Sequence, residues 1–245
     1  MPLSSNSLIH LTKKPDSLIG ILENNFKIFY CKETIYVKGG SINGAFPMVS
    51  FCDIPLSEIK NHIFNYGRYG IGLRKKWAIK KGLNPVLYIE KKSDLGADLI
   101  NTGNSMLSGK KTKKLEQNEY TIFNLFRYMK NYQCSLTRNG TTINDYRYSD
   151  EREWRYVPPD KDIDLMIPTA KFKDKKQKNL ANSHLKDLRL EFTPDDITYI
   201  IINDESEITK FIDVLRNTKG KKYTHQQVER LITRIFTTTQ IETDI

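Results

Sequence analysis

Short apolar runs of strand length alternate with helical patterns along this chain, and this alternation restricts the fold more than any other feature. Strand-like runs lie at Leu8 to Thr12, Met48 to Ile54 and Ile197 to Ile202. Apolar residues three and four positions apart follow Pro15 and recur in Ser206 to Asn217, which is the spacing of an amphipathic helix. Because strands and helices do not follow a strict βαβ order, the pattern predicts an α+β fold. We expect a mixed or antiparallel central sheet with flanking helices.

The length of 245 residues allows one large domain or two small ones. We expect a single domain, residues 1–245, with a core at about 7–165. Strands and helices of the segment 185–245 are expected to pack on this core. The polar stretch 91–118 is predicted to be a mobile insertion, which either closes over a substrate as a lid or is an expendable surface loop.

The chain is strongly basic, with 39 Lys and Arg against 29 Asp and Glu and a net charge of +10. Lysines cluster at Lys110 to Lys114, Lys171 to Lys178 and Lys219 to Lys222. A positive balance favours anionic partners, which are nucleic acid, nucleotide phosphates or an acidic protein. No DNA- or RNA-binding motif accompanies these basic loops, so they either bind such a partner or only confer solubility.

Several classes of protein are disfavoured by the sequence. No apolar run approaches the ~18–20 residues of a membrane span, and no secretory signal is visible, so we expect a cytoplasmic protein without membrane contact. Three scattered cysteines and four scattered histidines show no zinc spacing, and we expect no metal. Gly70 and Gly72 lack the third glycine of a dinucleotide-binding turn, so they are weak evidence for one.

The string DEREWR at 150–155 is the strongest candidate for chemistry. A β-strand is expected from Arg152 onwards, and side chains two residues apart along a strand point to the same face. Glu151, Glu153 and Arg155 would therefore share one face. Two neighbouring carboxylates repel, which raises one pKa unless a cation compensates, and such a pair suits general-base work or stabilisation of an oxocarbenium ion. The alternative is that Arg152 and Arg155 simply neutralise the glutamates at a strand edge.

A second group of candidates lies earlier in the chain. His10 and Thr12 share one face of the first expected strand, and Ser50 lies within another. Tyr66 and Tyr69 stand among glycines, and aromatic rings beside a backbone without side chains can form a slot for a flat ring. Each of these residues also has a purely structural interpretation, as a core or rim side chain.

The chain resembles the AbiGi-type abortive phage-infection proteins over nearly its whole length. The similarity rests on ordered strings, among them HLT, ILENNFKIFY, PMVSFCDIPLSEIKNHIFNYGRYGIGLRKKWAIKKGLNPVLYI, DEREWRYVP, LEFTPDDITYIIIND and TRIFTTTQIETDI. Members of that family are described as phage-resistance proteins and antitoxins. The resemblance therefore implies a role in antiviral defence, with a cognate toxin, a cognate antitoxin or a phage-triggered protein as partner.

The layout also resembles the ADP-ribosyltransferase fold, which implies NAD as substrate. In that interpretation His10 holds the NAD ribose, Ser50, Tyr66 and Tyr69 pack the nicotinamide, and Thr12 is a further cofactor-binding residue. Glu153 would be the catalytic glutamate that stabilises the oxocarbenium-like transition state, and Glu151 would position the acceptor. The Ser-Thr-Ser string of one transferase branch is absent, and the tyrosine spacing differs from the other branch.

Two functions follow from these resemblances. The first is an ADP-ribosyltransferase-like toxin that uses NAD to modify a nucleic acid or a protein. The second is a non-catalytic antitoxin or regulator that binds and neutralises a toxin. An enzyme would be toxic alone, whereas an antitoxin would be harmless alone and would rescue growth.

Overall fold

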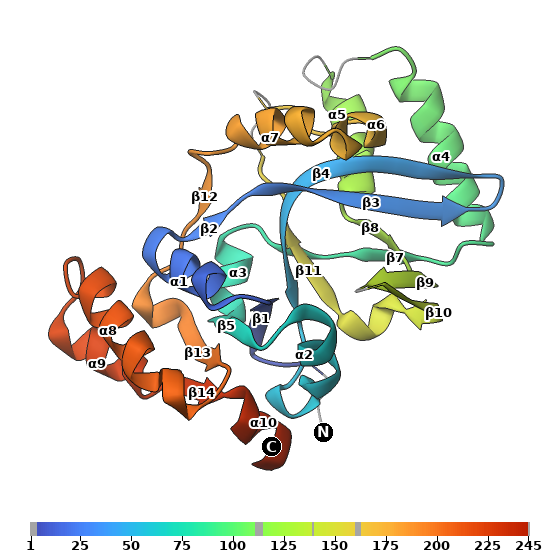
Figure 1. Ribbon diagram of the computed structural model, residues 1–245. Helices are drawn as coiled ribbons and strands as arrows, with labels where there is room; N and C mark the ends of the chain where they lie inside the picture. The colour runs from blue at the N-terminus through green and yellow to red at the C-terminus, as the bar shows by residue number, and fades with distance from the viewer. Residues whose placement is uncertain (1–3, 111–114, 139, 160–162, 245) are drawn as a thin grey trace. The chain divides into compact units, whose positions relative to one another are not determined.

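The computed structural model describes residues 4–110, 115–138, 140–159 and 163–244, and the chain divides into two compact units (Figure 1). Unit 1 consists of Met1–Lys27, Ser50–Leu83 and Arg189–Ile245, and unit 2 consists of Ile28–Val49 and Asn84–Leu188. The first and last segments of the chain belong to the same unit. The expectation of a single domain with a core at about 7–165 stays a prediction.

Unit 1 is built on a mixed sheet. The strands of this sheet that lie in unit 1 are β1 (Ser7–Thr12), the last residues of β4 (Gly40–Cys52), β5 (Tyr69–Arg74), β13 (Ile197–Ile202) and β14 (Ile235–Thr237). β2 (Phe26–Lys27) and β12 (Arg189–Leu190) pair with each other in a separate two-stranded sheet. Its helices are α1 (Pro15–Asn24), α2 (Lys60–Tyr66), α3 (Lys75–Lys80), α8 (Ile208–Lys219), α9 (His225–Ile232) and α10 (Thr238–Asp244). β5 pairs antiparallel with β1 and β13, whereas β13 and β14 are parallel. The expected α+β class and mixed sheet are confirmed.

The two faces of the unit 1 sheet are covered by different helices. Ile9 packs with Ile59 and Ile63 on one face, where α2 and α10 lie. Since strand side chains alternate, His10 points to the opposite face, which α1 and α8 cover. Gly72 leaves room for Tyr199 of β13, because a Cβ at Gly72 would lie 2.3 Å from that ring. The glycines of β5 thus serve strand packing rather than a phosphate-binding turn.

Unit 2 contains a long antiparallel hairpin of β3 (Phe29–Val37) and β4 (Figure 1). Its other strands are β6 (Asn84–Pro85), β7 (Leu87–Ile89), β8 (Met129–Asn131), β9 (Gln133–Arg138), β10 (Thr141–Arg147) and β11 (Glu153–Tyr156). Its helices are α4 (Asp94–Leu107), α5 (Gln117–Arg127), α6 (Thr169–Lys173) and α7 (Lys175–Ser183). The core that holds α4 and α5 against the hairpin includes Ile35, Ile89, Ile100, Phe126 and Met129.

The segment 91–118 is not the loop that its polarity suggests. Asp94–Leu107 form helix α4, which begins at Ser93, whose hydroxyl accepts a hydrogen bond from the backbone N–H of Gly96. Gly103 lets the helix lie directly on Phe126, since a Cβ there would fall 2.2 Å from the ring. The loop prediction is therefore wrong for residues 94–107, and Lys111 to Lys114 lie outside the described residues.

Candidate functional site

Five charged side chains meet inside unit 2, and we call them the buried ion network: Glu33, Lys130, Glu151, Glu153 and Arg155. Arg155 is fully buried, and Glu151 and Glu153 are 2% and 4% exposed. Because charges are rarely buried without partners, this cluster is the most unusual electrostatic feature of the described chain.

Glu153 stands at the centre of the network. Its Oε1 accepts a hydrogen bond from Arg155 Nε at 2.6 Å, and its Oε2 accepts one from Lys130 Nζ at 2.7 Å. Arg155 Nη2 also donates to Oε2 at 3.2 Å. Burial alone would raise the pKa of Glu153, but the charges of Arg155 and Lys130 hold it well below its usual range. Glu153 is therefore a carboxylate with both oxygens engaged.

Glu151 joins the network through the same lysine, although it does not lie on the strand. It ends a 3-10 turn at Tyr148–Glu151, and Arg152 follows in the left-handed conformation with φ of 45°. This reversal brings Glu151 Oε2 to 2.8 Å from Lys130 Nζ. The expectation that the strand begins at Arg152 is wrong, because β11 begins only at Glu153, and Glu151 does not share its alternation. The two carboxylates nevertheless share one partner.

Arg155 connects the network to the β3–β4 hairpin. Its Nη2 donates to Glu33 Oε1 at 2.9 Å, and its Nη1 donates to the carbonyl oxygen of Arg127 at 3.0 Å. Burial would lower the pKa of Arg155, but Glu153 and Glu33 raise it above its usual value. The pKa of Glu33 is raised by its burial, against the effect of Arg155 and Lys130. Three carboxylates thus share two cations.

Tyrosines surround the network. Tyr146 donates a hydrogen bond to Glu151 Oε1 at 3.1 Å, and Lys130 Nζ lies 4.7 Å from the ring centre of Tyr148. The backbone N–H of Glu153 donates to the hydroxyl of Tyr88 at 2.9 Å. Sequence reasoning found Glu151, Glu153 and Arg155 but missed Lys130 and Glu33. Nothing in the sequence marks either residue as a partner, since both lie on other strands.

The predicted NAD-binding residues all lie in unit 1, where His10 and Ser50 are brought together. His10 Nδ1 donates to the backbone carbonyl of Ser50 at 2.8 Å, and its ring packs edge-on against Phe26 and near Phe51. Burial lowers the pKa of His10 despite that hydrogen bond. These contacts make His10 a neutral ring within an aromatic cluster.

The remaining predicted residues are divided between the two faces of the unit 1 sheet. Thr12 is the register partner of Tyr69, so both share the face of His10. The Tyr69 hydroxyl donates to Glu207 at 2.9 Å, and burial together with this carboxylate raises the pKa of Tyr69 to about 12. Tyr66 belongs to α2, on the other face, and stacks on His62. The assignment of these residues to NAD stays a prediction.

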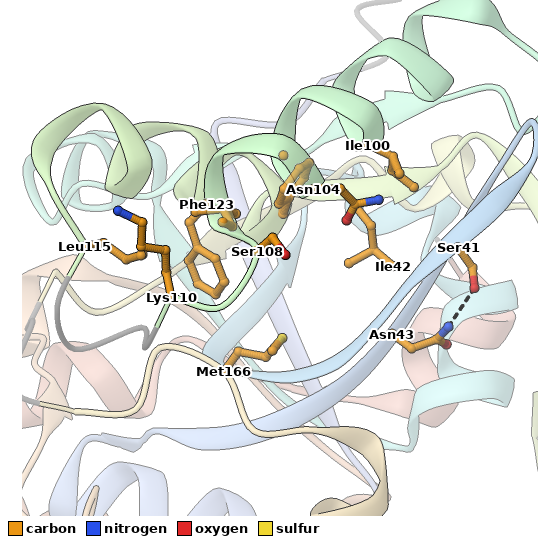
Figure 2. Close-up of a pocket in the computed structure, with 13 residues that line it drawn as sticks. Ser41, Ile42, Asn43, Ile100, Asn104, Ser108, Lys110, Leu115, Phe123 and Met166 are labelled. Atoms are coloured by element: carbon orange, nitrogen blue, oxygen red, sulfur yellow. Dashed lines mark hydrogen bonds between the residues drawn. The ribbon is translucent and has the colours of Figure 1, made fainter.

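A separate pocket of about 410 Å³ opens in unit 2 between α4, α5 and the start of β4 (Figure 2). Its buried part is apolar and includes Ile100, Phe123 and Phe126. Its exposed rim is polar and includes Asn43, Asn104, Ser108 and Lys110. Lys110 Nζ pairs with Glu119 at 2.7 Å, which offsets its charge. Its volume lies within the range of small-molecule sites in proteins, and none of its lining residues was predicted as a catalytic or NAD-binding residue.

No helix among the described residues is both long and apolar enough to cross a membrane. Within the same residues, no group of three or more His, Cys, Asp and Glu side chains is arranged to hold a metal ion.

Comparison with known proteins places the chain in a family. The family model described as "Putative abortive phage resistance protein AbiGi, antitoxin" matches residues 24–203. The chain belongs to the AbiGi family. The abortive phage resistance protein AbiGi of Lactococcus lactis subsp. cremoris is 26% identical over 219 residues, which cover 81% of this chain and 88% of that protein. No solved structure matches the chain.

The segment matched by the AbiGi family model contains both features of unit 2. All five residues of the buried ion network and the whole pocket lining lie within 24–203, whereas His10 and Thr12 precede it. The resemblance to the ADP-ribosyltransferase fold stays a prediction, since no matching solved structure supports it.

Proposed function

We propose that this chain is the antitoxin of an abortive-infection system, and that it acts by binding a toxin rather than by consuming NAD. The family description, which names an antitoxin, and the name of the Lactococcus relative support a role in phage resistance. The same proposal makes the toxin a protein partner of this chain.

One observation favours the antitoxin over the ADP-ribosyltransferase. The catalytic glutamate of a transferase must offer its carboxylate to the ribose as positive charge develops there. Glu153 instead lies 4% exposed, with Arg155 on one oxygen and Lys130 on the other. Freeing it would leave the fully buried Arg155 and the largely buried Lys130 with fewer partners, which is strongly unfavourable. This supports a structural role for the DEREWR string.

The experiment is expression of the chain in bacteria, alone and together with each protein encoded beside it. An antitoxin is harmless alone and restores growth when one of the neighbouring products is toxic. Growth arrest caused by the chain alone would contradict the proposal.

A second measurement tests the NAD chemistry directly and needs no variant. The purified chain is incubated with about 1 mM NAD, and released nicotinamide and the melting temperature are followed. We expect neither release nor stabilisation. Nicotinamide release would instead support the transferase, with Glu153 as its catalytic residue.

A further inference from the structure

Three arginines of unit 1 converge on one short turn, and we call Arg74, Arg230 and Arg234 the arginine cluster. The turn is the 3-10 helix Pro194–Asp196, which leads directly into β13. Arg74 ends β5, Arg230 lies in the last turn of α9, and Arg234 lies between α9 and β14. Because the three residues come from different elements, the fold brings them together and no sequence motif marks them.

Hydrogen bonds fix each arginine to this turn. Arg74 Nε donates to the backbone carbonyl of Asp195 at 2.8 Å, and Arg230 Nη2 donates to the Asp195 carboxylate. Arg234 Nη1 donates to the backbone carbonyl of Ile197. Asp195 and Ile197 are two residues apart, which separates their Cα atoms by at most about 7 Å. The three guanidinium groups are therefore held around one short piece of backbone.

The two acids of the turn have different roles. Asp195 pairs with the cluster through Oδ1, which accepts from Arg230, while its Oδ2 accepts from Gln227 Nε2 at 3.1 Å. Asp196 instead stabilises the turn, because its Oδ2 accepts hydrogen bonds from the backbone N–H of Thr193 at 2.8 Å and from the Thr193 hydroxyl at 2.7 Å. Among the described residues, one paired carboxylate thus serves three guanidinium groups.

The guanidinium groups of the cluster repel one another and still have donors to offer. Burial lowers the pKa of Arg234, and the charges of Arg74 and Arg230 lower it further against the effect of Asp195. Within the described residues, the hydrogen bonds of the cluster use one nitrogen of each arginine. Arg74 and Arg230 are exposed, so their other N–H groups lie at the surface. An anion bound there would relieve the repulsion.

We propose that the arginine cluster binds a phosphate monoester, whose oxygens accept hydrogen bonds from the free N–H groups of Arg74 and Arg230 beside the charge of Arg234. The planar guanidinium fork binds phosphate in a bidentate manner, which a lysine ammonium does not. A monoester offers three terminal oxygens and about −1.5 to −2 charge at pH 7, so it can satisfy several guanidinium groups at once. The site is additional to the proposed antitoxin function and does not rest on it.

The test is a phosphorus NMR titration of the full chain at a fixed ionic strength of about 0.15 M, which screens general attraction. The probes are inorganic phosphate and adenosine monophosphate, each followed through its own resonance, with adenosine as a competitor that lacks the phosphate. Equal affinity for the two probes would assign free phosphate as the ligand. Tighter binding of adenosine monophosphate, without displacement by adenosine, would assign a phosphate carried on a larger molecule. Both results support the proposal.

Two pairs of substitutions separate recognition from net charge. Arg74→Gln and Arg230→Gln are combined in the cluster variant. Lys60→Gln and Lys210→Gln are combined in the control, since both lysines are exposed elsewhere in unit 1. The net charge changes equally in both, and circular dichroism and the melting temperature establish that each is folded. A third variant combines Arg74→Lys and Arg230→Lys, which keeps the charge and removes the fork.

We expect the cluster variant to bind phosphate about tenfold more weakly or worse, because it loses charge-assisted hydrogen bonds. The control should bind as the wild type does, and the lysine variant should lie between the two. The proposal is overturned if the wild type binds neither probe up to about 10 mM, which corresponds to a dissociation constant too weak for a formed site. Equal loss in the cluster variant and the control would show a general charge effect, and full binding by the lysine variant would exclude guanidinium recognition.

A polynucleotide is the remaining alternative for this surface. Binding of a single-stranded RNA of about ten nucleotides that lacks a terminal phosphate, without binding of either probe, would assign the cluster to phosphodiesters and overturn the proposal. None of these measurements uses a toxin, so their outcome is separate from that of the growth experiment.

Discussion

Replacement of Lys130 by methionine should strongly destabilise unit 2. Lys130 Nζ lies 2.8 Å from Glu151 Oε2 and 2.7 Å from Glu153 Oε2. Methionine keeps most of the side-chain volume but removes the charge, which leaves three carboxylates with Arg155 as their remaining cation. Removing one partner from a buried ion pair costs about 3–5 kcal/mol, and we expect a loss in that range.

Glu33→Gln is the matched control. Glu33 contacts the same arginine, but its side chain is 19% exposed and its pKa is raised, so its charged form is disfavoured where it lies. Neutralising it also balances the remaining two carboxylates against two cations. The expected change is within about 1 kcal/mol.

The assay is urea denaturation followed by circular dichroism, with the midpoint and the slope fitted separately. A lower midpoint at unchanged slope reports a change in the free energy of unfolding. The reasoning is refuted if Lys130→Met leaves the midpoint unaltered, or if Glu33→Gln shifts it as much as Lys130→Met does.

Four other predictions concern pH, two glycines and a helix cap. Because the folded-state pKa of Glu153 is lowered, its charged form stabilises the fold at neutral pH, and this contribution is lost as pH falls below about 4.3. Glu153→Gln should therefore lose less stability than the wild type between about pH 5 and pH 3, as measured by urea denaturation at each pH. Gly103→Ala should lower the melting temperature, with a cost of about 1–3 kcal/mol, because its Cβ would meet Phe126 at 2.2 Å. Gly20→Ala should raise the melting temperature by the equivalent of about 0.5–1 kcal/mol. Gly20 lies within helix α1, and no atom lies within 4 Å of the position that a Cβ would take there. Thr224→Ala should cost about 1 kcal/mol by calorimetry, since the Thr224 hydroxyl caps α9 by accepting from the backbone N–H of Gln227.

Local patterns in the sequence were sufficient for elements whose apolar residues have a regular spacing. Leu8 to Thr12 is found as β1, and Ile197 to Ile202 is found as β13. The helix after Pro15 is also found, with Leu18 and Leu22 buried. In α1 the buried side chains are four residues apart, as the helical period requires, whereas β1 and β13 are recognised as short apolar runs of strand length.

Helix α4 was missed because its burial depends on small residues. Gly96 and Gly103 are buried there, and glycine in a sequence predicts a loop rather than a close helix contact. The polar residues between them face outward, and a polar stretch in a sequence also predicts a loop.

The candidate site could be predicted only in part. The two glutamates and Arg155 lie together in the sequence, but Lys130 reaches them from β8 and Glu33 reaches Arg155 from β3. Arg152, the expected partner by proximity, instead adopts the left-handed conformation that turns the chain. Long-range pairing of this kind leaves no periodic signal in the sequence.

The division of unit 1 into three segments fixes the order in which a ribosome can complete it. β5 emerges early, yet its partner β13 and the covering helix α8 belong to the segment Arg189–Ile245, which is translated last. A nascent chain therefore holds β5 without β13, whose Ile200 pairs with Ile71, until synthesis is nearly finished. Unit 2, whose segments all precede Arg189, has its complete sequence first. A transcript cut short before Arg189 thus encodes every residue of the buried ion network but only part of unit 1.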